Sequence, residues 1–454
     1  MSTVYCVVGG GISGLVAAYR LRMAAGPEAT VTLFDPADRL GGILRTERLA
    51  GQIMDVGAEA FIARRPEVSA LLAELGLAAR QIGTTGARPL IYSRARLHPL
   101  PAGTLQGIPA YPQSLIGLVD ERTIARIGEE PHRPLAWRPG ADPSVAALVG
   151  DRFGEQVVAR SVDPLLVGVY AGASDGIGLR SAVPTLAAAL DRGAPSVSAA
   201  VREVLPPPAT GSVFGAVAGG YQVLVDELVR RAGLDWVQVG IERVCRSERG
   251  WELIDDEGVA HHADAAVLAV PAAVLPRLVE EVAPRTAAAA RRIPIASAAV
   301  VALALPGGVP LPQNSGVLVA TGERLHTKAV TLSTRKWGPR GNVELVRLSY
   351  GRFGDTIARS TSDEQLLTWA AEDLATIFGI TTEPEDYLVQ RWLDVMPQYG
   401  PGHAELVAEL RAGLPPTLAV AGNYLDGIGV PACVAAGTRA AASLMTAVGA
   451  KNPA

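Results

Sequence analysis

The stretch Val4-Tyr5-Cys6-Val7-Val8-Gly9-Gly10-Gly11-Ile12-Ser13-Gly14 decides the fold class of this chain. Residues 4–8 are a short β-rich run that predicts a buried strand of a parallel sheet, and residues 15–21 continue at helical spacing. Gly9 permits a tight turn, Gly11 lets a pyrophosphate approach the backbone, and Gly14 lets the helix pack close to the strand. The pattern therefore predicts a Rossmann unit that binds a dinucleotide at the helix N-terminus.

A second strand adds support for this site. Val31-Thr32-Leu33-Phe34 ends at Asp35, about twenty residues after the glycine loop, where Rossmann folds place the acid that binds ribose hydroxyls. The glycines alone would also fit a turn in an unrelated α/β fold. The order of strand, loop, helix, strand and acid favours the dinucleotide site.

Composition excludes several classes of protein. The chain has 454 residues, which is too many for one hydrophobic core, so we expect two or three domains. The net charge of −4 and the lack of a basic stripe argue against nucleic acid as the main partner. The three cysteines, Cys6, Cys245 and Cys433, are too scattered for a disulfide framework or a metal site. We therefore expect no metal and a cytoplasmic location.

No stretch has the pattern of a signal peptide or of a clean membrane span. The first apolar run leads into glycines rather than into a cleavage site. The longest uncharged stretch, residues 294–322, is broken by Pro306, Pro310 and Pro312, which predicts buried strands and turns. A peripheral contact with a membrane stays open.

Later segments repeat the order of strand, glycines and helix. Residues 418–431 combine an apolar strand with Gly422, Gly427 and Gly429, and residues 433–448 follow at helical spacing. Backbone amides at this second helix start can stabilise negative charge on a bound cofactor. Residues 236–244 predict a strand and its continuation, and residues 263–271 predict a returning strand. The nucleotide-binding domain is therefore built from both ends of the chain and a middle piece.

Two further runs, Asp38-Arg39-Leu40-Gly41-Gly42 and Asp55-Val56-Gly57-Ala58-Glu59, follow the acid. They resemble the amine-oxidase-like flavoproteins, in which an arginine and two glycines lie against the flavin phosphates. An NAD dehydrogenase has no reason to carry this second phosphate loop, although Arg39 alone would also fit a solvated charge. The resemblance implies FAD, with Val244 pairing its backbone with adenine and Trp392 packing near the ring. The implied FAD-binding residues are Gly9, Gly10, Gly11, Ile12, Ser13, Gly14, Asp35, Arg39, Gly41, Gly42, Ile43, Gly57, Ala58, Glu59, Ala60, Val244, Trp392, Gly422, Ile428, Gly429 and Val430.

Other runs resemble one family, the protoporphyrinogen/coproporphyrinogen oxidases of haem synthesis, over essentially the whole chain. These runs are residues 97–101, 152–154, 163–172, 219–224, 335–337, 391–392, 396–399 and 402–403. The resemblance implies the six-electron oxidation of a cyclic tetrapyrrole, by hydride transfer from a meso methylene to flavin N5, with O2 reduced to H2O2. That chemistry explains why the sequence shows no Ser-His-Asp or metal constellation.

The resemblance implies an α/β fold in which a Rossmann-type FAD-binding domain of the amine-oxidase-like class carries two insertions. One insertion is a mixed-sheet substrate domain, and the other is a helical lobe that faces the membrane in some relatives. We expect the FAD-binding domain at residues 1–85, 206–292 and 396–454, the helical lobe at 86–205, and the substrate-binding domain at 293–395.

The substrate pocket of the family falls on Leu165, Gly168, Ser315, Gly316, Leu318, Leu348 and Met396. Gly168 would let the ring approach closely, and the larger side chains would hold its faces, although each would also fit ordinary core packing. Substrate carboxylates favour arginine. The position of the family's arginine is Pro89 here, so Arg88, Arg94 and Arg96 are candidates that would also fit a solvated surface.

The bacterial branch of the family implies coproporphyrinogen III as the substrate and coproporphyrin III as the product. Protoporphyrinogen IX is the alternative within the family, and the two substrates differ by two propionates against two vinyls. More distant alternatives are a flavin amine oxidase, a carotenoid desaturase, or a flavin-fold binding protein without activity. Hand-off of the product to a ferrochelatase and the oligomeric state stay open.

Overall fold

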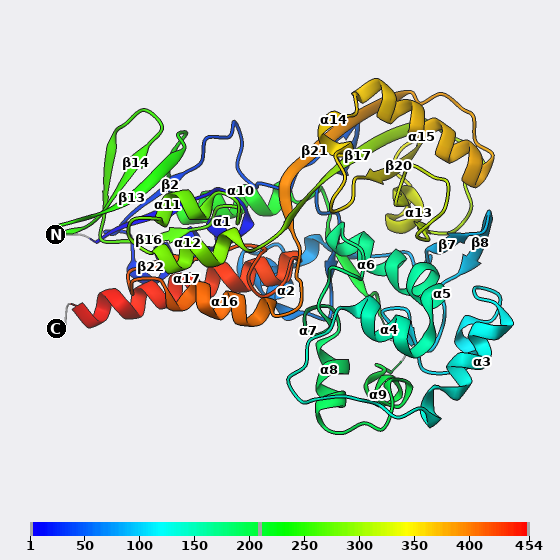
Figure 1. The fold of residues 1–454 in the computed structure, drawn as a ribbon. Coiled ribbons are helices and arrows are strands. Elements are labelled where there is room, and N and C mark those ends of the chain that lie inside the picture. The colour runs from blue at the N-terminus through cyan, green and yellow to red at the C-terminus, as the bar shows by residue number, and fades with distance from the viewer. Residues whose placement is uncertain (1–2, 208–210, 452–454) are drawn as a thin grey trace.

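The computed structural model describes residues 3–207 and 211–451 and contains a five-stranded parallel sheet that carries the first glycine loop (Figure 1). The strands lie in the order β12-β2-β1-β16-β22. Their bounds are β1 Val4–Val8, β2 Thr30–Phe34, β12 Asp235–Val237, β16 Ala265–Leu268 and β22 Leu418–Val420. The sheet joins segments from both ends and the middle of the chain, and it confirms the predicted Rossmann-type fold class.

Helices pack against this sheet and supply most of its core. α1 (Ile12–Ala25) contacts both α10 (Gln222–Ala232) and α17 (Val430–Lys451). The other helices of this body are α2 (Pro66–Glu74), α11 (Leu275–Val279), α12 (Pro284–Arg291) and α16 (His403–Ala412). Within the described part of the chain, α17 alone is long and apolar enough to cross a membrane. Its buried residues Val434, Ala440 and Leu444 belong to the main core, so it packs here as a core helix.

A three-stranded antiparallel sheet corrects one expectation. Residues 236–244 do not form one strand with its continuation, because Val237 pairs with Phe34 in the parallel sheet while Ile241 begins a separate sheet. That sheet consists of β13 (Ile241–Ser247), β14 (Gly250–Asp255) and β15 (Ala260–Ala263). The break lies at Gly240, whose amide bonds to the Asp256 carboxylate rather than continuing the first ladder.

A seven-stranded mixed sheet forms the second large body, with α15 (Asp363–Phe378) packed on one face (Figure 1). Its order is β21-β17-β20-β19-β18-β7-β8. The bounds are β21 Asp386–Pro397, β17 Ile295–Pro306, β20 Val343–Tyr350, β19 Ala329–Leu332, β18 Gly316–Val319, β7 Leu90–Ser93 and β8 Arg96–Pro99. The β7–β8 hairpin comes from the segment predicted to be helical, and it joins this sheet because β7 pairs in parallel with β18.

The helical lobe lies beside this sheet and has its own hydrophobic core (Figure 1). Its helices are short. They are α3 Glu121–Glu129, α4 Val145–Phe153, α5 Glu155–Val157, α6 Asp163–Tyr170, α7 Leu179–Ala182, α8 Pro184–Asp191 and α9 Val197–Val204. A π-helical turn at Val158–Val162 leads into α6, which lies between the lobe and the sheet (Figure 1).

Short elements connect these bodies. They are the strands β3 Thr46–Leu49, β4 Gln52–Asp55, β5 Phe61–Ile62, β6 Gln81–Gly83, β9 Thr104–Leu105, β10 Ile108–Pro109 and β11 Phe214–Val217, and the helices α13 Ser333–Trp337 and α14 Ile357–Ser360. β3 and β4 form a hairpin that continues into the turn at residues 56–60.

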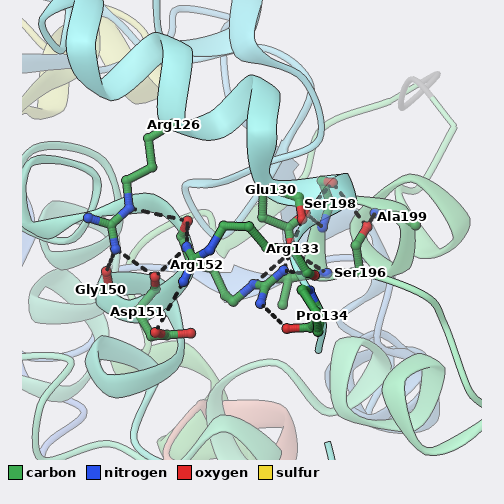
Figure 2. A network of polar contacts seen from close by, with 11 residues as sticks. Arg126, Glu130, Arg133, Pro134, Gly150, Asp151, Arg152, Ser196, Ser198 and Ala199 are labelled. Atoms are coloured by element: carbon green, nitrogen blue, oxygen red, sulfur yellow. Dashed lines mark hydrogen bonds and ion pairs between the residues drawn. The ribbon is translucent and has the colours of Figure 1, made fainter. Parts of the chain in front are cut away.

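A buried ion pair holds the helical lobe together (Figure 2). Arg152 Nε lies 3.0 Å from Glu130 Oε1, and both side chains are buried. The Glu130 carboxylate also accepts hydrogen bonds from the amides of Val197 and Ser198 at the start of α9, where the helix dipole favours an anion. Burial alone would raise the pKa of Glu130, but these hydrogen bonds and the charge of Arg152 lower it.

Candidate functional site

Two glycine loops pack against each other at the carboxyl edge of the parallel sheet. The Gly41 amide donates to the Gly10 carbonyl over 2.8 Å, and a Cβ on Gly42 would lie 3.0 Å from Gly11 Cα. A Cβ on Gly14 would meet the Gly9 carbonyl oxygen at 1.9 Å, which explains the need for glycine there. A Cβ on Gly11, by contrast, would meet nothing within 4 Å. The loop therefore has open space at the helix N-terminus, where a phosphate would bind.

Asp35 closes one side of this loop. Its Oδ2 accepts a hydrogen bond of 2.6 Å from the Gly10 amide, and its Oδ1 accepts one of 2.9 Å from the Ala37 amide. The carboxylate therefore lies at the end of β2 and next to the glycine loop, as the ribose-binding role requires. That role remains a prediction.

Arg39 holds the second glycine loop from within. Its guanidinium donates to the carbonyls of Leu40 and Leu44 at 3.1 and 3.0 Å, and to the Gly42 carbonyl at 2.5 Å. Burial, followed by the neighbouring charge of Arg45, lowers the pKa of Arg39. Arg39 is therefore not a solvated surface charge, because its donors shape the loop. A phosphate would bind the N–H groups of the guanidinium that do not donate to these carbonyls.

The third glycine loop, residues 421–429, precedes α17 and lies beside the first. The Ser13 hydroxyl donates to the Cys433 carbonyl over 3.1 Å, and a Cβ on Gly437 would lie 2.3 Å from the Ser13 carbonyl oxygen. The first turns of α1 and α17 therefore lie side by side. Because the N-terminus of a helix carries partial positive charge, both helix starts favour negative charge in the same space.

Two side chains that the sequence analysis left without a role brace this third loop. The Tyr399 hydroxyl donates to the Asn423 carbonyl and accepts from the Gly427 amide at 3.0 Å. His403 Nε2 lies 2.9 Å from the Tyr424 carbonyl. Burial lowers the pKa of His403, so the ring is neutral at pH 7 and can donate through Nε2.

The turn at Gly57–Ala60 connects the glycine loops to the seven-stranded sheet. Trp392 Nε1 donates to the Val56 carbonyl over 3.1 Å, and a Cβ on Gly57 would lie 3.1 Å from Trp392 Cζ2. Arg347 donates to the Gly57 carbonyl over 3.0 Å. Ile43 packs from the other side, since the Ala58 amide donates to its carbonyl at 3.2 Å. The structure therefore brings Trp392, which is predicted to pack near the ring, to the turn at Gly57.

The Glu59 carboxylate points away from the glycine loops and into an ion cluster. It lies 2.8 Å from Lys336 Nζ and 3.8 Å from an Arg347 nitrogen, and it accepts 2.9 Å hydrogen bonds from Ser333 and Trp337. Burial raises the pKa of Glu59, but these two cations outweigh it and hold the value at about 2. The carboxylate is therefore occupied by these partners, and the predicted cofactor role of Glu59 remains a prediction for its backbone.

One face of the seven-stranded sheet, which we call the inner face, is defined by a row of residues in register. The register aligns Gln390, Val300, Ser349, Ala329 and Leu318 across five strands. Facing residues of paired strands share one side of a sheet, so this row lies on one face. Leu318 meets α6, because a Cβ on Gly168 would lie 3.8 Å from Leu318 Cδ2. The inner face therefore extends from α6 toward the turn at Gly57.

Leu348 does not belong to the inner face, so its predicted contact with substrate finds no support in this packing and stays a prediction. Its side chain is fully buried in the core that includes Leu366 and Leu374 of α15. Side chains alternate along a strand, so the neighbouring Arg347 takes the inner face, where it contacts Gly57. Family position alone does not reveal this alternation.

The remaining predicted substrate residues occupy different places. Leu165 on α6 and Met396 on β21 are half-buried, and Gly168 is exposed. Ser315 is buried, and its amide donates to the carbonyl of the exposed Arg88 at 3.2 Å. Gly316 is needed for strand packing, since a Cβ there would meet the Val330 carbonyl oxygen at 2.2 Å.

Two predicted cofactor residues lie farther from the first glycine loop. Ile428 packs against the core of the helical lobe. Val244 is buried and pairs with Leu253, three residues beyond Ile241. Gly240, the residue before β13, lies next to Pro36, since a Cβ there would lie 3.8 Å from Pro36 Cβ. The adenine contact of Val244 therefore remains a prediction.

The site so assembled fits a flavin dinucleotide. Gly11 leaves a cradle that a Cβ would fill, two helix N-termini face one space, and Trp392 and Gly57 border it. The inner face and α6 lie next to that space, where Leu318 meets α6 and Arg347 contacts Gly57. Such an arrangement can bind a ring cofactor and a flat substrate together, and it can stabilise negative charge on the cofactor.

Comparisons with known proteins agree with this geometry. The sequence profile of the family described as "Flavin containing amine oxidoreductase" matches residues 12–445. A protein named coproporphyrinogen III oxidase from Mycobacterium tuberculosis is 64% identical over 447 residues, covering 98% of each chain. Human protoporphyrinogen oxidase is 28% identical over 98% of this chain and 99% of its own. A crystal structure from Exiguobacterium, provisionally named protoporphyrinogen oxidase, superposes with a TM-score of 0.88 at 26% identity and covers 98% of this chain and 99% of its own.

Proposed function

Because this chain belongs to the family of flavin-containing amine oxidoreductases, we propose that it oxidises coproporphyrinogen III to coproporphyrin III. The observation that carries the proposal is the 64% identity to the mycobacterial coproporphyrinogen III oxidase over 98% of both chains. The open space at Gly11 and the inner face of the seven-stranded sheet support the proposal. The chain is thus a flavin-dependent porphyrinogen oxidase.

We infer that the flavin is FAD rather than a mononucleotide. Gly9–Gly14 and Gly41–Gly42 form a paired cradle for a pyrophosphate, and Asp35 lies where a ribose would follow. When bound, the flavin supplies a hydride acceptor, which the protein side chains lack. Peptide amides at the starts of α1 and α17 would stabilise the negative charge that such an acceptor gains.

The chain's own residues would position the substrate. Gly168 exposes the backbone of α6 opposite Leu318, which leaves room for the edge of a macrocycle. Small residues of the inner face, such as Ala329 and Ser349, keep the opposite wall flat. Leu165 and Met396 are half-buried and would exclude water from the reacting edge. Orientation of a methylene toward the cofactor is the main contribution of such a site.

Protoporphyrinogen IX is the second candidate substrate, because the chain is 28% identical to the human protoporphyrinogen oxidase. The two substrates share the ring and differ in the number of propionates. Selectivity between them must therefore come from cationic side chains near the ring edge. An amine oxidase or a carotenoid desaturase would need no such cations.

The proposed function also includes an electron acceptor, a by-product and a location in the cell. O2 is the proposed electron acceptor and H2O2 the proposed by-product. The proposed location is the cytoplasm, where the buried thiols of Cys6 and Cys433 would stay reduced. A peripheral membrane contact and a hand-off of coproporphyrin III to a ferrochelatase are left as predictions.

Aerobic turnover of the purified protein tests the proposal. Coproporphyrin fluorescence and peroxide would be followed together, and each porphyrin formed should release three molecules of H2O2, because six electrons reduce three O2. We expect kcat/KM for coproporphyrinogen III to exceed that for protoporphyrinogen IX by about tenfold or more, as one lost charge-assisted contact predicts. Equal or reversed values would contradict the substrate assignment.

A further inference from the structure

Two basic side chains at the end of α6 lack a carboxylate partner. Arg352 follows β20, and its guanidinium makes no hydrogen bond or ion pair to any described residue, although the residue is partly buried. Lys328 is only 6% exposed, and its Nζ donates over 2.5 Å to the Gly351 carbonyl. Within the described ranges no carboxylate oxygen lies within 4.0 Å of either cation. Buried cations are normally paired, so this arrangement requires an explanation.

The nearest carboxylates are already used by other groups. Asp163 accepts from the Ser174 hydroxyl at 2.6 Å and from the Thr321 hydroxyl at 2.8 Å. Asp355 accepts from the amides of Arg352 and Ile357 at 2.7 and 3.1 Å and so caps α14. Burial, followed by the charge of Arg352, lowers the pKa of Lys328 to about 7. Asp163 and Asp355 act on Arg352 through their charge, but neither carboxylate forms an ion pair with its guanidinium.

The position of these cations coincides with the proposed substrate surface. The Phe353 amide donates to the Ala171 carbonyl over 2.7 Å, which fixes Arg352 against the end of α6, three residues after Gly168. Gln398 Nε2 donates to the Tyr170 carbonyl at 2.7 Å and to the Met396 carbonyl at 3.0 Å. The segments around Gly168, Arg352 and Met396 therefore meet at one place.

This place also opens to solvent. Gly168 is exposed, Val169 is 45% exposed, and Phe353 is 46% exposed. Exposed apolar side chains thus lie next to a partly buried basic residue. A flat apolar molecule that carries acidic groups on its edge matches this distribution of charge and hydrophobicity.

We propose that Arg352 binds a substrate carboxylate and that Lys328, behind it, is a positioning residue that adds positive charge and holds the Gly351 backbone. The assignment rests on the proposed function, because only an acidic tetrapyrrole gives the site its ligand. A guanidinium presents two parallel N–H donors to a carboxylate, so Arg352 can bind a propionate in a bidentate manner. It replaces Arg88, Arg94 and Arg96, which lie exposed in other parts of the chain.

The binding of coproporphyrin III, measured by absorbance titration of the flavin-loaded protein, tests this assignment. Arg352→Gln should raise the Kd by about tenfold to a hundredfold, as the loss of a charge-assisted hydrogen bond predicts, and Arg352→Lys should recover part of the loss. Arg324→Gln is the matched control, since Arg324 is exposed, lies four residues from Lys328 and carries the same charge. It should leave the Kd within about twofold, as expected for an isolated surface charge.

A second ligand separates a carboxylate contact from a general structural effect. Coproporphyrin III tetramethyl ester keeps the ring but has no carboxylates, so Arg352→Gln should leave its Kd unchanged. If the variant weakens acid and ester equally, the assignment is wrong. Should Arg352→Gln fail to retain flavin, Arg352→Lys and the acid-to-ester ratio of the unaltered protein decide the question. An unaltered protein that binds both forms equally well overturns it.

The pH dependence of the same titration tests Lys328. A bound carboxylate favours the charged lysine, so the affinity of the unaltered protein should fall as pH rises above about 7. The groups that face Lys328 are Arg352 and Asp355, and Asp163 acts on Arg352. Lys328→Met should bind more weakly at pH 6 and lose this pH dependence, and an unchanged profile would exclude the role.

Failure of this inference can be told apart from failure of the proposed function. If the unaltered protein oxidises neither porphyrinogen, the proposed function is wrong. If it oxidises coproporphyrinogen III while Arg352→Gln keeps the original Kd and KM, only the carboxylate assignment is wrong.

Discussion

The hydroxyl of Ser13 donates a hydrogen bond of 3.1 Å to the carbonyl of Cys433, although 420 positions separate the two residues in the chain. Ser13 is the second residue of α1, and Cys433 is the fourth of α17. The contact holds two helix N-termini next to each other, so two distant glycine loops act on the same space. The proposed flavin site depends on this arrangement, and the predictions below test its parts.

Closer contact between the two helices should be poorly tolerated. Gly437→Ala places a Cβ 2.3 Å from the Ser13 carbonyl oxygen, which must push α17 away from α1. Overpacking of this kind costs about 1–3 kcal/mol, so we expect the Kd for flavin to rise about tenfold. Gly449→Ala in the same helix meets nothing within 4 Å and serves as the control. Equal flavin binding by both variants would contradict the prediction.

Substitution of Gly14 should lower thermal stability, whereas substitution of Gly11 should abolish flavin binding. Gly14→Ala puts a Cβ 1.9 Å from the Gly9 carbonyl oxygen, so the flavin-free protein should unfold at a lower temperature. Gly11→Ala meets no atom within 4 Å, so its flavin-free form should melt like the original while its flavin binding is lost. Thermal unfolding and flavin titration of both variants check this. A melting temperature lowered equally in both would count against an open phosphate cradle.

The ion cluster of Glu59 should stabilise the fold. Glu59→Gln leaves Lys336 and Arg347 without their carboxylate, and breaking a buried pair costs about 3–5 kcal/mol. Denaturant unfolding measures the loss. Glu280→Gln, which breaks only the exposed pair with Arg291, should cost less than about 1 kcal/mol.

The same cluster sets a dependence on pH. The pKa of Glu59 is about 2 in the folded protein, against 4.5 for a free glutamate. A lowered carboxyl pKa contributes stability that is fully present above pH 4.5 and is lost as the pH falls toward 2. The difference in unfolding free energy between the unaltered protein and Glu59→Gln should therefore shrink over this range. A difference that stays constant from pH 5 to pH 2.5 would exclude the cluster as its source.

Leu348 and Leu318 are both assigned to the substrate pocket by family position, but their truncation should have different effects. Leu348→Ala removes a fully buried side chain from the core under α15, so it should cost about 2–5 kcal/mol of stability. The kcat/KM of its folded fraction should not change. Leu318→Ala should instead raise KM at little cost in stability, because Leu318 is half-buried and faces Gly168. Denaturant unfolding and steady-state kinetics of both variants distinguish these outcomes.

The fold class could be predicted from the sequence because each required glycine contacts residues that are close to it in the chain. The spacing of Gly9, Gly11 and Gly14 reflects contacts within one strand–loop–helix unit, and Asp35 follows at the distance that one crossover helix imposes. The same logic gave the strand and helix around Gly422–Val430. These elements appear where the sequence predicted them.

The side-chain roles were less accessible, because they depend on which face of an element meets its neighbour. Leu348 and Arg347 are adjacent in sequence, yet only the register with β17 and β19 shows that Arg347 takes the inner face. Glu59 lies within a flavin motif, but its partners Ser333, Lys336 and Trp337 are more than 270 residues away. Lysine occurs only three times in the sequence. Lys328 and Lys336 could therefore have been singled out as candidate functional residues from composition alone.

Anaerobic mixing of the flavin-loaded protein with each reduced substrate tests the central claim most directly. The account predicts that coproporphyrinogen III bleaches the flavin absorbance in a single turnover, faster than protoporphyrinogen IX at equal concentration, and that a primary amine leaves the absorbance unchanged. Bleaching by the amine with no response to either porphyrinogen would contradict it.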